Sequence, residues 1–107
     1  MSGTTASTVL QYVHGQKSSL VALIKDLVEA ESPSAHPETH DEARRVLRLA
    51  LAGVGYESRE TGASPNPRHV FARPAQRPRG QPSQLLLGHY DTVWPISTLQ
   101  QRPFSVD

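Results

Sequence analysis

The sequence predicts an α/β fold, and three observations support this prediction. Segments 9–30 and 38–52 repeat apolar residues at the spacing of an amphipathic helix. Segments 56–61 and 69–73 have the length of strands and are separated by a turn-rich loop. The apolar run 85–87 ends at a glycine, which is typical of a buried strand in a parallel sheet. The chain of 107 residues forms at most one small domain.

The first predicted helix covers Val9–Ala30. Its apolar face consists of Val13, Leu20, Ile24, Leu27 and Val28. Gly15 and the pair Ser18-Ser19 are poor helix formers in its middle, so we expect a frayed first turn. Ser32-Pro33 ends this helix, because the residue before a proline avoids the helical region.

The second predicted helix covers Glu38–Ala52. Thr39 and Glu42 have the spacing of a capping box at its beginning. Its buried stripe consists of Ala43, Val46, Leu47, Ala50 and Val54. Glycines follow at 53 and 55 and supply the C-terminal stop.

Three arginines, Arg44, Arg45 and Arg48, lie mostly on the opposite side of this helix. They could be read as a surface for phosphate or nucleic acid. Acidic residues, Asp41 and Glu42, stand beside them, so we expect a solvated helix face instead.

The three predicted strands differ in character. Tyr56–Thr61 is polar, which places it at or near a sheet edge, and His69–Arg73 follows after the turn-rich loop. Pro74–Ser83 contains three prolines and a glycine and is expected to be a surface loop. Leu85–Leu87 then leads directly into Gly88.

Composition excludes several classes of function. A net charge of +1 gives no general attraction to nucleic acid or to an anionic membrane. The absence of cysteine excludes a disulfide framework and thiolate metal sites. No apolar run approaches membrane-spanning length, and the start of the chain lacks the features of a signal peptide. We therefore expect a cytoplasmic protein that binds neither nucleic acid nor membrane.

His89 and Asp91, just beyond the leucine run, are the residues most suited to chemistry. Functional groups collect beyond the carboxyl ends of parallel strands. Residues two apart in an extended chain point to the same side, so the imidazole and the carboxylate should face one space. An imidazole is the commonest metal ligand, and a carboxylate beside it can orient it. For the tripeptide alone, a strand-end histidine capped by a loop aspartate is the favoured interpretation.

The longer string around these residues adds a resemblance. Leu-Leu-Leu-Gly-His-Tyr-Asp-Thr-Val (85–93), followed by Trp94-Pro95, Thr98-Leu99 and Pro103-Phe104, resembles the zinc-dependent exopeptidases and deacylases. That family includes glutamate carboxypeptidase, acetylornithine deacetylase, succinyl-diaminopimelate desuccinylase and aminoacylase. The glutamate carboxypeptidase branch is the most similar, although Ser97 stands where that branch usually has glycine. The resemblance is sharp over 85–104 and weaker over 20–73.

The resemblance implies that residues 1–107 are the N-terminal portion of a zinc-exopeptidase catalytic domain. In that domain two helices pack on a mixed sheet, and the strand before the first metal ligand lies in its middle. The intact enzyme would hold two zinc ions, or cobalt or manganese in their place. His89 would bind one ion, and Asp91 would be the catalytic residue behind it. The bridging aspartate, the glutamate base and the dimerisation domain would lie outside these residues.

The same resemblance implies a small peptide or N-acyl amino acid as substrate, cleaved next to a carboxylate-bearing residue, by an enzyme that forms homodimers. The chain by itself should hydrolyse nothing, because one ligand falls short of the three that a catalytic zinc needs. The alternative is a non-catalytic α/β piece that acts through protein association.

The other histidines offer no second site. His36 and His40 are four apart, but Pro37 lies between them and the glutamate is misplaced for a His-Glu-x-x-His motif, so we expect a loop and a helix cap. His14 and His69 have no partner pattern, and we expect them to be structural or solvated.

Overall fold

The computed structural model describes residues 3–107, so the first two residues of the predicted unit lie outside the described part. The helices are α1 (Gly3–Gly15), α2 (Lys17–Glu29), α3 (Asp41–Gly53) and α4 (Thr98–Gln101), with a 3-10 turn, η1 (Pro37–Thr39), before α3. The strands are β1 (Tyr56–Thr61) and β2 (His69–Pro74). The α/β prediction is therefore confirmed in its broad form: helices combine with a two-stranded antiparallel sheet.

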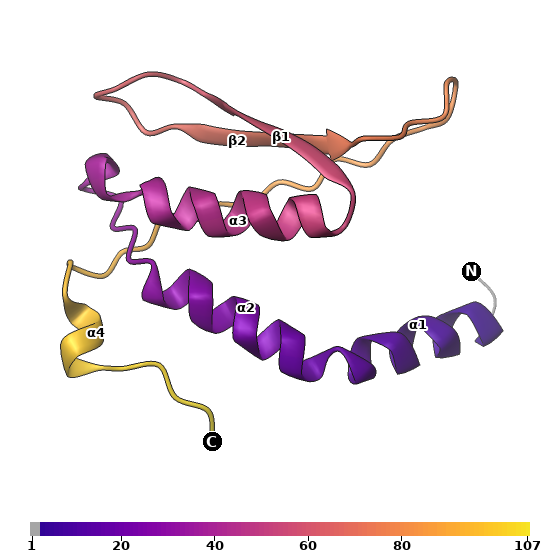
Figure 1. Ribbon diagram of the computed structural model, residues 1–107, viewed down its shortest axis with the longest axis horizontal. Coiled ribbons are helices and arrows are strands. Elements are labelled where there is room, and N and C mark those ends of the chain that lie inside the picture. Colours follow the sequence, from indigo (N-terminus) through magenta and orange to yellow (C-terminus); the bar gives the residue numbers. More distant parts are fainter. Residues whose placement is uncertain (1–2) are drawn as a thin grey trace.

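The predicted helix over 9–30 is wrong in one respect, because it is two helices. They meet at Gln16, whose N–H bonds the carbonyls of both Tyr12 (3.1 Å) and Val13 (3.0 Å). Gly15 directly precedes this break, and its low helix propensity explains the position. The first turn is not frayed: α1 is helical from Gly3 onward. In Figure 1 α1 points away from the rest of the molecule, and none of its residues is buried.

The α3 helix begins at Asp41, three residues later than expected, because Pro37–Thr39 forms the 3-10 turn. The predicted capping box does not form. The Thr39 hydroxyl instead donates to the carbonyl of His36 (2.8 Å), and no side chain caps the helix. Ala43 and Val46 are buried as expected, whereas Val54 follows the helix end and is 71% exposed.

The two strands predicted over 56–61 and 69–73 are confirmed, and they pair as a hairpin. β1 pairs antiparallel with β2 from Tyr56 opposite Pro74 to Thr61 opposite His69, which makes β2 one residue longer than predicted. Alternate residues of both strands are half-buried, and this face of the hairpin lies over α3, as Figure 1 shows. The α2 helix packs on another side of α3.

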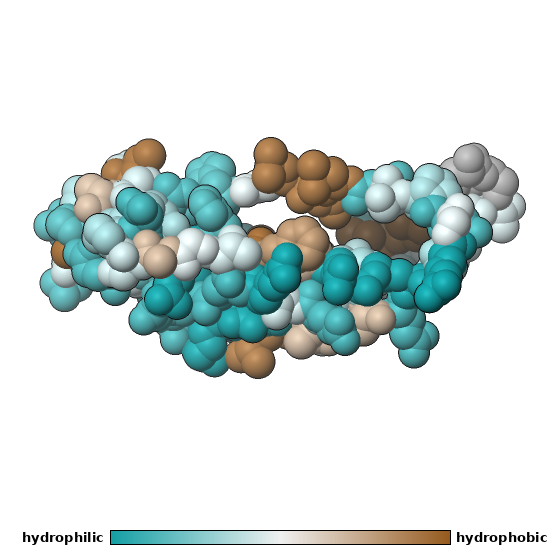
Figure 2. Space-filling model, turned by 90° about the horizontal axis from the view of Figure 1, so that it is seen from above, coloured by the Kyte–Doolittle hydropathy of each residue, from teal (hydrophilic) through white to brown (hydrophobic). Residues whose placement is uncertain are grey.

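The prediction of a buried strand at Leu85–Leu87 is wrong. These leucines are 85%, 89% and 91% exposed, and they belong to no strand. A strand buried on both faces needs neighbouring strands and covering helices, and the described residues supply neither at this place. The mixed sheet with this strand in its middle is therefore absent from residues 3–107, where the only sheet is the β1–β2 pair. Figure 2 shows apolar side chains standing exposed on one face of the molecule.

The molecule is more open than a typical domain of its length. Its radius of gyration is 16.6 Å, against about 13 Å expected for a compact domain of this size. Among residues 3–107, no helix has both the length and the apolar character needed to cross a bilayer.

Candidate functional site

The segment that carries His89 and Asp91 is attached to the loop after α2. Thr92 N–H donates to the carbonyl of Ser32, and Ser34 N–H donates to the carbonyl of Thr92, both at 2.8 Å. These bonds form a parallel bridge between Pro33 and Thr92. The Ser32 hydroxyl adds a third bond, to the carbonyl of Tyr90 (2.8 Å). The site is thus built from two loops rather than from the end of a sheet strand.

The structure brings His89 and Asp91 into direct contact. His89 Nδ1 lies 3.0 Å from Asp91 Oδ1 and 3.0 Å from the Asp91 carbonyl. A proton on Nδ1 satisfies these acceptors and leaves the Nε2 lone pair available. The His89 side chain is 82% exposed, and no hydrogen bond of the described residues uses Nε2. A carboxylate behind one ring nitrogen is the usual arrangement around a metal-binding histidine.

Ser34 completes the contacts of the Asp91 carboxylate. Its hydroxyl donates to Asp91 Oδ2 (2.5 Å), while Oδ1 faces His89. The bond from Ser34 lowers the pKa of Asp91, burial opposes this, and the bond to His89 lowers the pKa further. Sequence reasoning missed Ser34, because the contact joins positions 57 apart and no local pattern connects them.

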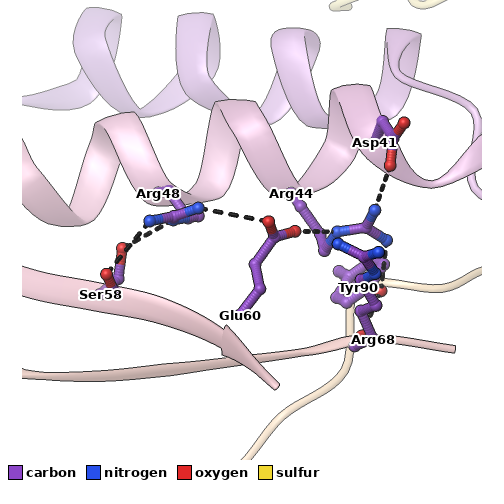
Figure 3. A network of polar contacts seen from close by, with 7 residues as sticks. All are labelled: Asp41, Arg44, Arg48, Ser58, Glu60, Arg68 and Tyr90. Carbon is purple, nitrogen blue, oxygen red and sulfur yellow. Dashed lines mark hydrogen bonds and ion pairs between the residues drawn. The ribbon is translucent and has the colours of Figure 1, made fainter. Parts of the chain in front are cut away.

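Tyr90 links the same segment to α3 and to the loop between β1 and β2. Its hydroxyl donates to the carbonyl of Arg68 (2.6 Å) and accepts a hydrogen bond from Arg44 Nη1 (3.2 Å), as Figure 3 shows. Its ring meets the ring of His40 edge to face, with centroids 5.4 Å apart. Because neighbouring residues of an extended segment point to opposite sides, anchoring Tyr90 turns His89 and Asp91 away from α3.

The expectation of a solvated arginine face is wrong for Arg44, which is only 4% exposed. Its guanidinium pairs with the carboxylates of Asp41 and Glu60 in addition to Tyr90. Burial acts to lower the pKa of Arg44, but its hydrogen bonds to Tyr90 and Glu60 raise it overall. Glu60 and Tyr90 come from distant parts of the chain, so the helix pattern alone could not reveal them.

The other two arginines of α3 are closer to the expectation. Arg45 is exposed and pairs with Glu42. Arg48 is half-exposed and reaches across to β1, where it bonds Glu60 (3.3 Å) and both the hydroxyl and the carbonyl of Ser58. Figure 3 shows Glu60 between Arg44 and Arg48.

His40 occupies the N-cap position of α3, and its side chain is buried, with 1% exposure, without capping the helix. Its Nε2 donates to the carbonyl of Pro33 (2.7 Å), and its Nδ1 has no hydrogen-bond partner. His36 is exposed and contacts Glu38 (3.1 Å). The two rings are therefore engaged separately. His14 and His69 are exposed.

Glu31 holds the last part of the chain. Its carboxylate accepts hydrogen bonds from the N–H groups of Ser97 (2.5 Å) and Leu99 (3.1 Å) at the start of α4. Ser97 has φ 72°, a left-handed conformation that glycine adopts most readily.

Among residues 3–107, no group of three or more His, Asp or Glu side chains could hold a metal ion. Within these residues His89 has one neighbouring carboxylate, that of Asp91. Comparisons with family models, with curated proteins and with solved structures found no match to this chain.

Proposed function

We propose that these residues are the N-terminal part of the catalytic domain of a di-zinc metallohydrolase. The enzyme would cleave peptide or N-acyl amide bonds next to a carboxylate-bearing residue. The observation that carries the proposal is the contact between His89 Nδ1 and the Asp91 carboxylate (3.0 Å) on a His89 side chain that is 82% exposed. A carboxylate on Nδ1 of an otherwise exposed imidazole is the arrangement that a metal-binding histidine has.

The donor set fits one corner of a zinc site. An imidazole nitrogen is a normal zinc ligand, and a catalytic ion needs about three protein ligands with an open position. His89 would supply one of these ligands through Nε2. Asp91 would hold the Nδ1 proton, fix the plane of the ring and make Nε2 more basic. The zinc ions, when bound, polarise the substrate carbonyl and activate water.

The backbone at Ser97 also supports the proposal. The glutamate carboxypeptidase branch that the sequence resembles usually has glycine at this place, and Ser97 adopts the backbone conformation that glycine favours. The turn before α4 therefore keeps a glycine-type shape in spite of the serine. We extend the proposal to a cytoplasmic homodimer that acts on small peptides or N-acyl amino acids.

The test uses the protein encoded by the complete reading frame that contains these residues. We expect two zinc ions per chain and zinc-dependent release of an amino acid from N-acyl glutamate or a related substrate. The variant His89→Ala should lose activity and metal, with His69→Ala as the matched control on an exposed histidine. A frame that ends at residue 107, or a purified protein with neither metal nor activity, contradicts the proposal.

A second function is favoured by one observation, the exposure of Leu85–Leu87 (85–91%). Exposed apolar segments with unpaired backbone recruit other chains. In this alternative the chain is non-catalytic and acts by association. Metal titration of the purified protein separates the two: a protein that takes up no zinc, yet sediments as an oligomer that Leu86→Ser disperses, supports this alternative.

A further inference from the structure

We propose that Ser34 is a positioning residue for His89, acting through the Asp91 carboxylate. The role of His89 as a metal ligand rests on the proposed function above. The hydrogen-bond relay from Ser34 to Asp91 to His89 involves these three side chains alone and can be tested without any metal.

The relay uses the two carboxylate oxygens for different tasks. Oδ2 accepts from the Ser34 hydroxyl (2.5 Å), and Oδ1 faces His89 Nδ1 (3.0 Å). The terminal torsion of an aspartate is broad, so a carboxylate held by one contact turns easily. A second contact on the opposite oxygen fixes the plane of the carboxylate and thereby the direction in which Oδ1 points.

Ser34 is well placed to be the fixed end of this relay. Its own N–H bonds the carbonyl of Thr92 (2.8 Å), so its backbone is already tied to the segment that it orients. Its hydroxyl also lies 2.9 Å from that carbonyl. A hydroxyl has one proton to donate. Of its two possible acceptors, the charged Asp91 carboxylate is the closer and the stronger.

Ser32 provides an internal control. Its hydroxyl bonds the same segment at the carbonyl of Tyr90 (2.8 Å) but does not touch Asp91. If Ser34 acted only by attaching the segment, loss of either hydroxyl would have a similar effect on His89. If Ser34 acts on the carboxylate, only its own loss should affect the imidazole.

The experiment measures the tautomer of His89 in the ¹⁵N-labelled chain at neutral pH, by long-range ¹H–¹⁵N NMR of the ring. In the unmodified chain we expect the proton on Nδ1. In Ser34→Ala we expect a shift to a mixture of both tautomers, whereas Ser32→Ala should leave the ring unchanged. An unchanged tautomer in Ser34→Ala overturns the proposal.

A further pair of variants covers loss of structure in Ser34→Ala. Ser34→Thr keeps the hydroxyl. Ser34→Val has nearly the same shape as the threonine variant, with a methyl group in place of the hydroxyl. We expect the Nδ1 tautomer in the threonine variant and the mixture in the valine variant, with the Thr92 amide signal reporting whether the bridge is intact. The same ring state in both variants contradicts the relay.

Zinc chloride titration of the same samples separates this inference from the proposed function. A tautomer that depends on Ser34, with no zinc response at Nε2, supports the relay and counts against the metal role. A zinc response at Nε2 with a tautomer independent of Ser34 supports the metal role and overturns the relay.

Discussion

The layer of α3 and the β1–β2 hairpin is stabilised differently from the segment 85–107. The first is closed by packed side chains, with Ala43 and Val46 buried and Arg44 enclosed by its partners. The second has exposed leucines and only the short helix α4. It is attached by one parallel bridge, by hydrogen bonds with Ser32, Ser34 and Glu31, and by the Tyr90 hydroxyl.

This difference shows what positions the candidate site. His89 and Asp91 are not fixed by membership of a sheet. They are fixed by Tyr90, which is bonded to Arg44 of the packed layer, and by the loop after α2. A small number of polar contacts therefore ties the site to α3 and to the loop after α2.

Arg44→Ala should have the largest effect, because it leaves the partly buried Glu60 without its closest cation. We expect a loss of about 3 kcal/mol in the free energy of unfolding. Arg45→Ala is the matched control, since it also removes an arginine with an acidic partner three residues earlier, but on the exposed side. Its loss should be at most about 0.5 kcal/mol. Urea denaturation measures both free energies of unfolding. Equal losses in the two variants contradict the claim that the buried face of α3 contributes more to stability than the exposed face.

Val46→Ala and Leu86→Ala compare apolar truncation in the two regions. Val46 is buried, with 9% exposure, so we expect a loss of about 2 kcal/mol from lost transfer energy and the cavity. Leu86 is 89% exposed, and its truncation should change stability by less than about 0.5 kcal/mol. Denaturation curves measure both, and a large cost at Leu86 indicates that the leucine run is buried after all.

The elements that the sequence predicted well are those with local causes. The hairpin strands and the α3 helix follow from periodicity, glycine and proline, and all three are present within a few residues of their expected bounds. The break at Gln16 also has a local cause in Gly15, although its effect was expected as fraying rather than as two helices.

The parts that could not be predicted depend on distant partners. Arg44 is buried because Glu60 and Tyr90 reach it, and Ser34 meets Asp91 across 57 positions. Leu85–Leu87 has the composition of a buried strand, but burial needs neighbours that residues 3–107 do not supply. The spacing of His89 and Asp91 does place them on one side, and the contact between them is direct.

We expect a smaller loss of stability when the pH is lowered. The pKa of Asp91 lies below its ordinary value of 3.8, first because Ser34 bonds the charged form. The stabilising contribution of the carboxylate is therefore complete above pH 3.8 and is lost as pH falls below 3.8 through the lowered pKa. The effect is modest because the side chain is 39% exposed.

The amide chemical shifts of Ser34 and Thr92 should change in a titration step as Asp91 becomes protonated. The amide shifts of α3 near Val46 should not show this step. The variant Asp91→Asn should lack the step altogether. A step at Ser34 and Thr92 that persists in Asp91→Asn indicates that another group is responsible.

The most direct test of the central claim, that His89 is one isolated zinc ligand oriented by Asp91, is a zinc titration of the 107-residue chain followed at His89 by ring ¹⁵N NMR. We predict weak binding that perturbs Nε2 of His89 and vanishes in His89→Ala. Tight one-to-one binding abolished by His89→Ala contradicts the claim, because it means that further ligands converge on the site. The absence of any response at Nε2 also contradicts the claim, because it means that His89 does not bind zinc.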